Sequence, residues 1–220
     1  MKNVIGGRVA SMALASVVGA ILSPVAASAA EASANALEEI VVTAQRREER
    51  LQDVPISVSA YGQATLDAQS IRSIDDVSRL APGVNFAHGT NYNSASSDIA
   101  IRGVQSSAGA ATTGVYIDDT PIQTRHLSFG TFNAYPALFD IGRVEVLRGP
   151  QGTLFGSGSE GGTVRFIMPE AQLTGESAYL RSELATTTHG DPSYEVGAAY
   201  GAPITEGTLG YRASVSYRRN

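Results

Sequence analysis

The 220-residue sequence contains no cysteine and no tryptophan, and its only lysine is Lys2. The absence of cysteine excludes disulfide bonds, thiolate metal sites and a cysteine nucleophile. The three histidines, His88, His126 and His189, are far apart, so a histidine metal site is not expected. Arginine supplies every other basic charge, and it stays charged when buried and grips a carboxylate with two hydrogen bonds. The composition therefore favours interior ion pairs over metal or thiol chemistry.

The sequence also contains fewer basic than acidic residues. The formal charge at pH 7 is -5, and it becomes more negative if the N-terminal Lys2 and Arg8 are removed. An acidic chain without a basic stripe is a poor ligand for a phosphate backbone. No nucleic-acid partner is expected.

The stretch from Asp140 to Met168 is the most informative part of the sequence. It contains two segments with alternating β-branched residues, on either side of the glycine-rich Gly149–Gly162. Alternation with period two is typical of half-buried strands, and many glycines indicate backbone at positive φ or in close contact with a neighbour. The sequence therefore predicts two strands joined by a glycine-rich turn.

Within that turn, Gly156–Gly161 fits the pattern G-x-G-x-x-G of dinucleotide-binding proteins. That pattern requires a helix after the glycines, so that the pyrophosphate lies at the helix N-terminus. Here Thr163–Ile167 follows, which is strand sequence, and no lysine is available for a phosphate loop. Nucleotide binding is not expected, no cofactor is expected, and no catalytic residue is assigned.

The N-terminal Met1–Ala30 has the organisation of a secretory signal peptide. Basic Lys2 and Arg8 precede the apolar run Val9–Leu22, and the small residues Ala27–Ala29 form a cleavage site. A membrane-spanning helix needs about 20 apolar residues, which this run does not reach. We therefore expect cleavage and export from the cytoplasm.

The segments VEVLRGPQGTLFG, at Val144–Gly156, and GGTVRFI, at Gly161–Ile167, resemble the end of the plug domain of TonB-dependent outer-membrane receptors. The resemblance implies an α+β fold class: a plug with a small mixed sheet and short helices, followed by the first antiparallel strands of a transmembrane β-barrel. The implied domains are the signal peptide (1–30), a periplasmic linker (31–53), the plug (54–169) and the start of a truncated barrel (170–220).

The β-prone segment before the plug resembles the TonB box, which the energy-transducing TonB protein binds from the periplasmic side. By itself it is a short strand near a free terminus, open to pairing with another chain. The residues assigned to TonB binding are Glu39, Ile40, Val41, Val42, Thr43 and Ala44. No room remains for an additional N-terminal signalling domain, so transport without signalling is expected.

Two arginines and two loops complete the predicted site. Arg102 and Arg148 each precede a glycine at the end of an apolar run, in the motifs IRG and LRGP. In the family the matching arginines pair with glutamates on the inner barrel wall; the alternative is two arginines at a solvated sheet edge. The resemblance also implies that two polar loops face the extracellular ligand. Their candidate contact residues are Tyr92, His126 and Phe129.

After Pro169 three segments of about ten residues, 179–187, 194–203 and 209–218, alternate apolar and polar side chains. Apolar-out, polar-in strands of this length suit a transmembrane barrel, although a soluble antiparallel sheet shows the same alternation. Adjacent strand residues point to opposite faces, so Asp118 and Asp119 are not expected to act as a catalytic pair, and a turn ahead of Pro121 is expected instead. Earlier in the chain, the alternation of Val54–Ser59 predicts a strand, and Ser73 with Asp76 three residues later predicts a capping box at the start of a helix.

The resemblance implies active transport of a scarce ligand across the bacterial outer membrane. The ligand is a ferric siderophore by default, with cobalamin, a glycan or an aromatic compound as alternatives. The implied partners are TonB with its inner-membrane motor proteins, outer-membrane lipid and the small extracellular ligand. The competing hypothesis is a secreted or surface-attached β-rich binding module without transport.

Overall fold

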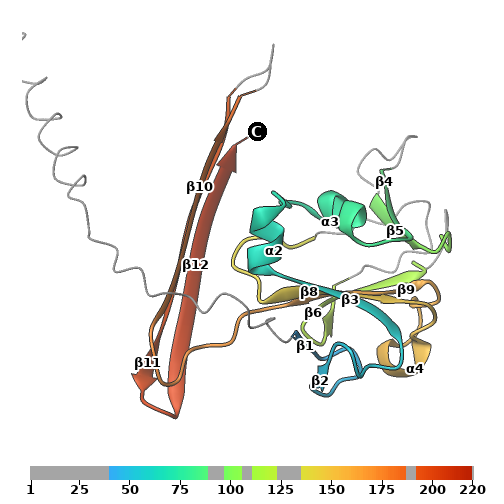
Figure 1. Ribbon diagram of the computed structural model, residues 1–220, viewed down its shortest axis with the longest axis horizontal. Coiled ribbons are helices and arrows are strands. Elements are labelled where there is room, and N and C mark those ends of the chain that lie inside the picture. The colour runs from blue at the N-terminus through green and yellow to red at the C-terminus, as the bar shows by residue number, and fades with distance from the viewer. Residues whose placement is uncertain (1–39, 89–96, 106–110, 123–134, 187–191, 220) are drawn as a thin grey trace, which may run out of the picture. The chain divides into compact units, whose positions relative to one another are not determined.

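The computed structural model describes residues 40–88, 97–105, 111–122, 135–186 and 192–219. The predicted signal peptide and Glu39 lie outside these residues, as do Tyr92, His126 and Phe129. Residues 40–168 form an α+β domain, and residues 177–219 form a separate three-stranded sheet (Figure 1).

The α+β domain is built on a five-stranded mixed sheet with the strand order β3-β8-β9-β6-β7. β8 and β9 pair antiparallel across the glycine-rich segment, as predicted, while β9 pairs parallel with β6. Among the described strands, β3 lies at the edge of the sheet and pairs only with β8. The strand bounds are β3 Ser57–Gly62, β6 Thr113–Ile117, β7 Thr120–Pro121, β8 Arg143–Arg148 and β9 Gly162–Ile167.

One face of this sheet is covered by α2 (Gln63–Ala68) and α3 (Ile74–Leu80), as Figure 1 shows. The α3 helix begins at Ser73 with the capping box that the sequence predicts, in which Ser73 and Asp76 bond reciprocally. The hairpin of β4 (Val84–His88) and β5 (Ser97–Ile101) lies beside α3. The helix-face core is the larger apolar cluster; its fully buried members include Leu66, Val77, Ile101, Leu138, Val144, Val146 and Phe166.

The opposite face of the sheet is covered by three short elements: β1 (Val41–Val42), β2 (Glu49–Arg50) and α4 (Gly152–Phe155). A second apolar cluster fills this side, here called the box-face core; its buried members are Val42, Ala44, Val54, Ala60, Tyr116, Leu147 and Phe155. Because successive strand residues point to opposite faces, β8 sends Val144 and Val146 to the helices and Glu145 and Leu147 to the box face.

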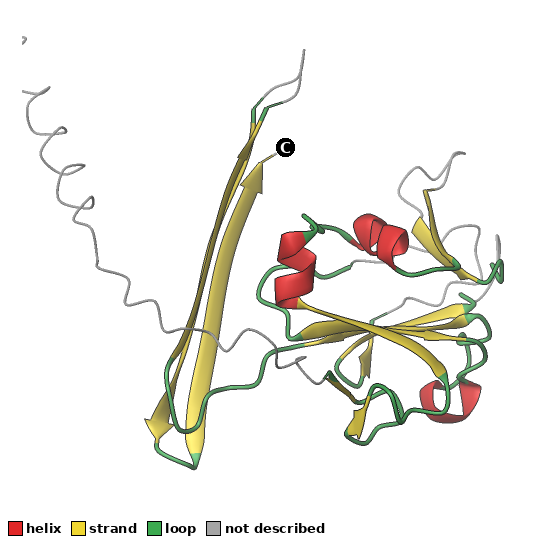
Figure 2. Ribbon diagram, viewed as in Figure 1, coloured by secondary structure: helices red, strands yellow, loops and turns green. Residues whose placement is uncertain are grey.

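The second sheet consists of β10 (Ser177–Ala185), β11 (Ser193–Thr205) and β12 (Leu209–Arg219), paired antiparallel in chain order. Figure 2 shows that this part contains strands and connecting loops, whereas the described helices lie in the α+β domain. One face of the sheet exposes apolar side chains such as Leu180, Val196 and Val215, which are 76%, 50% and 71% exposed. The alternation predicted after Pro169 is therefore present. None of the described helices has the length and hydropathy to cross a bilayer.

Two details differ from the sequence prediction. The strand predicted from Val54 begins at Ser57, because Val54 instead packs into the box-face core. The glycine-rich turn contains a helical turn, α4, which buries Phe155 at 3% exposure against Tyr116. Both differences come from apolar side chains that find long-range partners, which strand periodicity does not report.

Candidate functional site

The box segment, Ile40–Ala44, is packed onto the sheet rather than extended into solvent. β1 pairs antiparallel with β2, so one edge of the segment is already occupied. Val42 and Ala44 are fully buried in the box-face core, whereas Ile40 and Val41 on the outer side are 37% and 41% exposed. The sequence predicts an exposed edge strand here, and the structure instead shows a docked one.

Thr43, between the two buried residues, has all its polar groups bonded to charged side chains. Its amide donates to Glu145 Oε1 at 2.9 Å, and its carbonyl accepts from Arg165 Nη1 at 2.6 Å. Its hydroxyl accepts from Arg165 Nη1 at 2.9 Å and from Arg143 Nη2 at 3.1 Å. The second edge of the box segment is thus occupied as well, by side chains in place of a strand.

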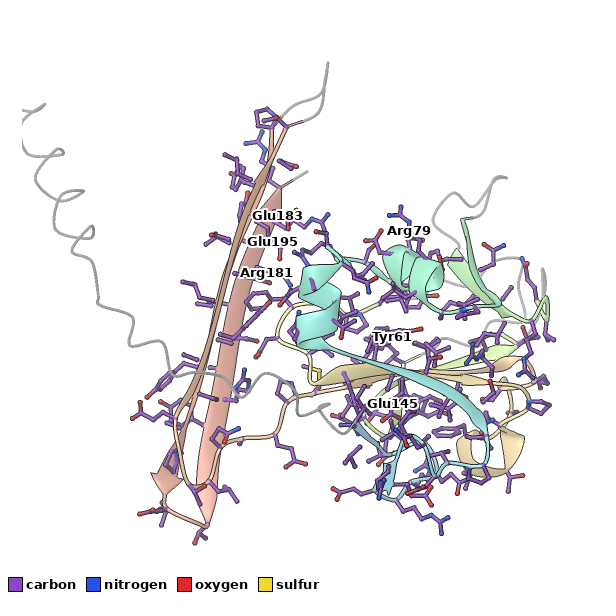
Figure 3. All side chains as sticks on the ribbon, in the orientation of Figure 1. Tyr61, Arg79, Glu145, Arg181, Glu183 and Glu195 are labelled. Carbon is purple, nitrogen blue, oxygen red and sulfur yellow. The ribbon has the colours of Figure 1, made fainter. Side chains whose placement is uncertain are left out.

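Glu145 and Arg165 form the centre of this arrangement. We call these two residues and Arg143, which surround Thr43, the Thr43 clamp. Arg165 Nη1 lies 2.8 Å from Glu145 Oε2, and the two side chains are 3% and 0% exposed. Arg143 Nε adds a second ion pair to Glu145 at 2.7 Å, and Arg165 stacks over the Phe155 ring at 5.6 Å. Figure 3 shows Glu145 on the side of the sheet that carries β1 and β2. A buried charge with several partners is costly to disturb, because removing one partner leaves another charge unsatisfied.

The sequence contains a signal for this clamp. Glu145 and Arg165 are direct partners in the β8–β9 ladder, so opposite charges at paired positions of two buried strands point to an ion pair. The contribution of Thr43 has no such signal, because it lies about 100 residues away in the sequence.

The predicted arginines Arg102 and Arg148 lie close together. Arg148 Nη2 donates to Ser59 Oγ at 2.9 Å and Nη1 to the Pro82 carbonyl at 3.2 Å, while its buried Nε has no partner among the described residues. Arg102 has a positive φ of 55°, and its Nη1 lies 3.4 Å from where a Cβ on Gly149 would be. Neither arginine forms an ion pair within the part of the chain that the structure describes.

A second charged cluster joins the α+β domain to β10 and β11, and we call it the Asp67 network. Asp67 Oδ1 accepts from Arg181 at 3.2 Å and from Arg72 at 3.3 Å, and Oδ2 accepts from the Tyr179 hydroxyl at 2.8 Å. Arg72 Nε continues to Glu183 at 2.9 Å. The network therefore links α2 and the residues after it to the polar face of the strands.

On the strands, two acidic residues of this network lie directly opposite each other in the β10–β11 ladder, Glu183 and Glu195. Like charges at paired positions repel, but each has an arginine: Glu183 pairs with Arg72, and Glu195 with Arg181. Figure 3 shows Arg181, Glu183 and Glu195 along these two strands. Arg181 lies in β10 itself, whereas Arg72 belongs to the α+β domain, so the partner of Glu183 is supplied only when that domain is docked.

A third set of contacts comes from the segment before β8. Arg212 of β12 forms a two-pronged ion pair with Asp140, and Arg181 Nη1 donates to the Leu138 carbonyl at 3.0 Å. Phe139 packs against β11 at Gly197, where any Cβ would overlap its ring. A glycine is required at that position because the aromatic ring takes the space of a side chain.

Comparison with known families is decisive. Residues 50–163 match the family model described as the TonB-dependent Receptor Plug Domain. The chain belongs to the TonB-dependent receptor family. Its α+β domain is therefore a plug, and the predicted fold class, a plug followed by antiparallel strands, is confirmed.

Individual relatives support the same family assignment. An iron-regulated outer membrane virulence protein of Vibrio cholerae is 33% identical over 141 residues, which cover 61% of this chain and 20% of that protein. A vitamin B12 transporter of Photobacterium profundum is 30% identical over 182 residues, covering 83% of this chain and 28% of that protein. The crystal structure of the ferric yersiniabactin uptake receptor of Yersinia pestis superposes with a TM-score of 0.59 at 25% identity, covering 73% of this chain and 24% of the receptor.

The Vibrio cholerae relative is named as an outer-membrane protein, and this TonB-dependent receptor is likewise assigned to the bacterial outer membrane. The chain spans 20% and 28% of the length of the curated relatives from Vibrio cholerae and Photobacterium profundum. Of its predicted site residues, the structure places Ile40 to Ala44 on the plug, and Arg102 beside the Arg148–Gly149 turn.

Proposed function

We propose that this receptor transports a scarce ligand actively across the outer membrane, with the plug as gate and the box segment as the coupling point to TonB. The observation that carries the proposal is the docked box segment. Its β1 strand is short and the side chains of Ile40 and Val41 are about two-fifths exposed, so TonB can contact them while the segment is docked and pair with its backbone once the segment leaves β2. Glu39, outside the described residues, is assigned to the same contact.

Energy has to arrive mechanically, because the outer membrane holds neither an ion gradient nor a nucleotide pool. TonB and its inner-membrane motor proteins would pull the box segment, and the Thr43 clamp sets the resistance to that pull. No bond chemistry is needed, so no catalytic residue is proposed. The clamp is a suitable latch because the Thr43 amide and carbonyl bond to Glu145 and Arg165, so removing Thr43 takes a hydrogen-bond partner from each of these buried side chains.

The neighbouring Arg102 and Arg148 support the rest of the gate. Two arginines in proximity, one with a buried and unpartnered Nε, call for acidic partners. We propose that glutamates on the inner wall of a lipid-embedded barrel supply them. Residues 170–220 would begin that barrel, because their exposed apolar face suits outer-membrane lipid. In this arrangement residues 1–30 are the signal peptide, 31–53 the periplasmic linker and 54–169 the plug.

The ligand is proposed as a class. Relatives carry names that refer to ferric yersiniabactin and to vitamin B12. A ferric siderophore is the default for this receptor, bound in part by the plug loops that contain Tyr92, His126 and Phe129. These loops lie outside the described residues, so their role stays a prediction.

Substituting proline at Val41 tests the coupling. Proline at position 41 removes a backbone donor from β1, and the Val41 side chain it replaces is 41% exposed and outside the box-face core, so the plug core stays intact while strand pairing with TonB fails. The full-length Val41→Pro receptor should bind ligand normally and lose uptake into cells, whereas Val41→Ala should retain both. Normal uptake by Val41→Pro would refute the proposal.

A further inference from the structure

We propose that the Asp67 network is a fixed anchor that limits how much of the plug TonB can extract. On pulling, residues 40–62 leave the sheet, and extraction stops at α2. This inference rests on the proposed function for the origin of the pull, but the anchor itself is a property of the chain.

The order of the elements along the chain defines what a pull at the box segment loads. After the box segment come β2 and then β3, which is an edge strand with a single partner, β8. An edge strand can be peeled from one neighbour without breaking the remaining sheet, whereas β8, β9 and β6 each have two neighbours. The next element after β3 is α2, which begins at Gln63.

The contacts that hold residues 40–62 are separable one after another. Once the Thr43 clamp opens, β3 is held, among the described residues, by its ladder to β8, by the apolar contacts of Ala60 and Tyr61 with the two cores, and by two side-chain bonds. The Tyr61 hydroxyl donates to the Leu80 carbonyl at 2.8 Å, and Ser59 Oγ accepts from Arg148 at 2.9 Å. When a strand is peeled from one end, the pulling force acts on one ladder bond at a time. Each bond therefore breaks at low force.

At α2 the situation changes, because the chain is tied to strands outside the plug. Asp67 is bonded simultaneously to Arg181 and Tyr179 of β10, and Arg72 to Glu183 of the same strand. Arg72 is 11% exposed and Arg181 9% exposed, whereas their acidic partners Asp67 and Glu183 are 28% and 39% exposed, so these ion pairs are partly shielded from solvent. Parallel, charge-assisted bonds must break together before α2 can move. Leu66 adds a fully buried apolar contact at the same point.

Stopping at α2 would divide the plug into two parts. The extracted part takes Val42, Ala44, Val54 and Ala60 out of the box-face core and leaves β8 as the new sheet edge. The retained part keeps the helix-face core, the Asp67 network and the Asp140–Arg212 pair. A passage would then open beside β8, while the remaining plug stays attached to β10–β12.

A force experiment on the full-length receptor in a lipid bilayer measures this limit without any ligand. A handle is attached at Glu38→Cys, since this chain has no other cysteine, with any cysteine beyond it replaced. Pulling on the handle should give a first extension of about 80 Å, the extended length of residues 40–62. Resistance should then rise sharply. A first extension of several hundred ångströms, as for release of residues 40–169, would overturn the proposal.

Variants assign the stop to the anchor. Asp67→Ala with Arg72→Ala removes the plug side of the network and leaves β10–β12 unchanged, so the stop near 80 Å should disappear. Tyr179→Phe, which removes one hydroxyl, should lower the force at the stop while keeping its position. The matched control is Arg79→Gln, because Arg79 is 76% exposed and pairs only with Asp76 of its own helix among the described residues. A stop that persists unchanged in the double variant would refute the anchor.

The same receptor pulled through a bound periplasmic fragment of TonB separates the two proposals. Failure of the fragment to hold the box segment would contradict the proposed coupling and leave the handle result standing. A stop at about 80 Å with the handle but not in the double variant supports the anchor in either case.

Discussion

Glu145 and Arg165 face each other across the β8–β9 ladder and form a 2.8 Å ion pair. Glu145 Oε1 also accepts from the Thr43 amide, and Arg165 Nη1 donates to the Thr43 carbonyl. The pair thus has two roles: it neutralises two charges inside the sheet and it holds the box segment. Because the same two side chains serve both roles, substitutions at the pair should change both the stability of the plug and the exposure of the box segment.

Glu145→Gln should release the box segment. The change leaves the buried Arg165 and the partly exposed Arg143 near each other without their shared carboxylate, at a cost of roughly 3 kcal/mol. Opening of the segment should rise about 100-fold. The readout is the rate at which a charged maleimide labels Val42→Cys in the full-length receptor without an energy source. Asp53→Asn, at an exposed surface pair, is the control, and an unchanged labelling rate in Glu145→Gln would contradict the clamp.

Thr43→Val should give a smaller effect of the same kind. Valine keeps the shape of threonine but removes the acceptor for Arg165 and Arg143, which costs about 1–2 kcal/mol. The labelling rate should rise about tenfold. Thr43→Ser retains the hydroxyl and should remain close to the wild type. Equal rates for the valine and serine variants would show that the hydroxyl does not contribute.

Gly197→Ala should loosen the plug from the strands. The added methyl group overlaps the Phe139 ring, and overpacking of this kind costs about 1–3 kcal/mol. The urea concentration at which the plug becomes protease-sensitive should fall. Phe139→Leu in the same chain should restore part of the loss. Gly175→Ala, where a Cβ meets no atom within 4 Å, is the control, and an equal effect there would argue against the contact.

The α3 cap should make plug stability depend on pH at the acidic end. Burial raises the pKa of Asp76, but hydrogen bonds from the Ser73 hydroxyl and from the Arg72 and Ser73 amides outweigh it and hold the pKa below its ordinary value of 3.8. A lowered pKa stabilises the fold above the unfolded-state value, and the gain is lost as the pH falls through the folded-state pKa. The stability difference between wild type and Asp76→Asn should therefore shrink below about pH 4.

In the same experiment Ser73→Ala should cost about 1 kcal/mol at neutral pH, as expected for loss of an N-cap side chain. It should also move the acid transition to higher pH, since the strongest bond to the carboxylate is removed. The measurement is urea unfolding of the plug at a series of pH values. A difference between wild type and Asp76→Asn that does not vary with pH would rule out this account.

The sequence by itself determined the features that depend on near neighbours. Strand alternation identified β8, β9 and the β10–β12 sheet, and the Ser73–Asp76 spacing identified the start of α3. The family followed from the contiguous motifs around Gly149, now confirmed by the match over residues 50–163. These signals are local, because backbone periodicity and capping involve residues only a few positions apart.

Only the tertiary structure decided how distant charges are paired. Thr43 meets Glu145 across about 100 residues of sequence, and Asp67 meets Tyr179 across a similar distance. Periodicity gives the face on which a side chain lies, but not which remote side chain it reaches. The packing of the sheet selected these partners, because a charge that is removed from water must be paired, and the available partner depends on the fold.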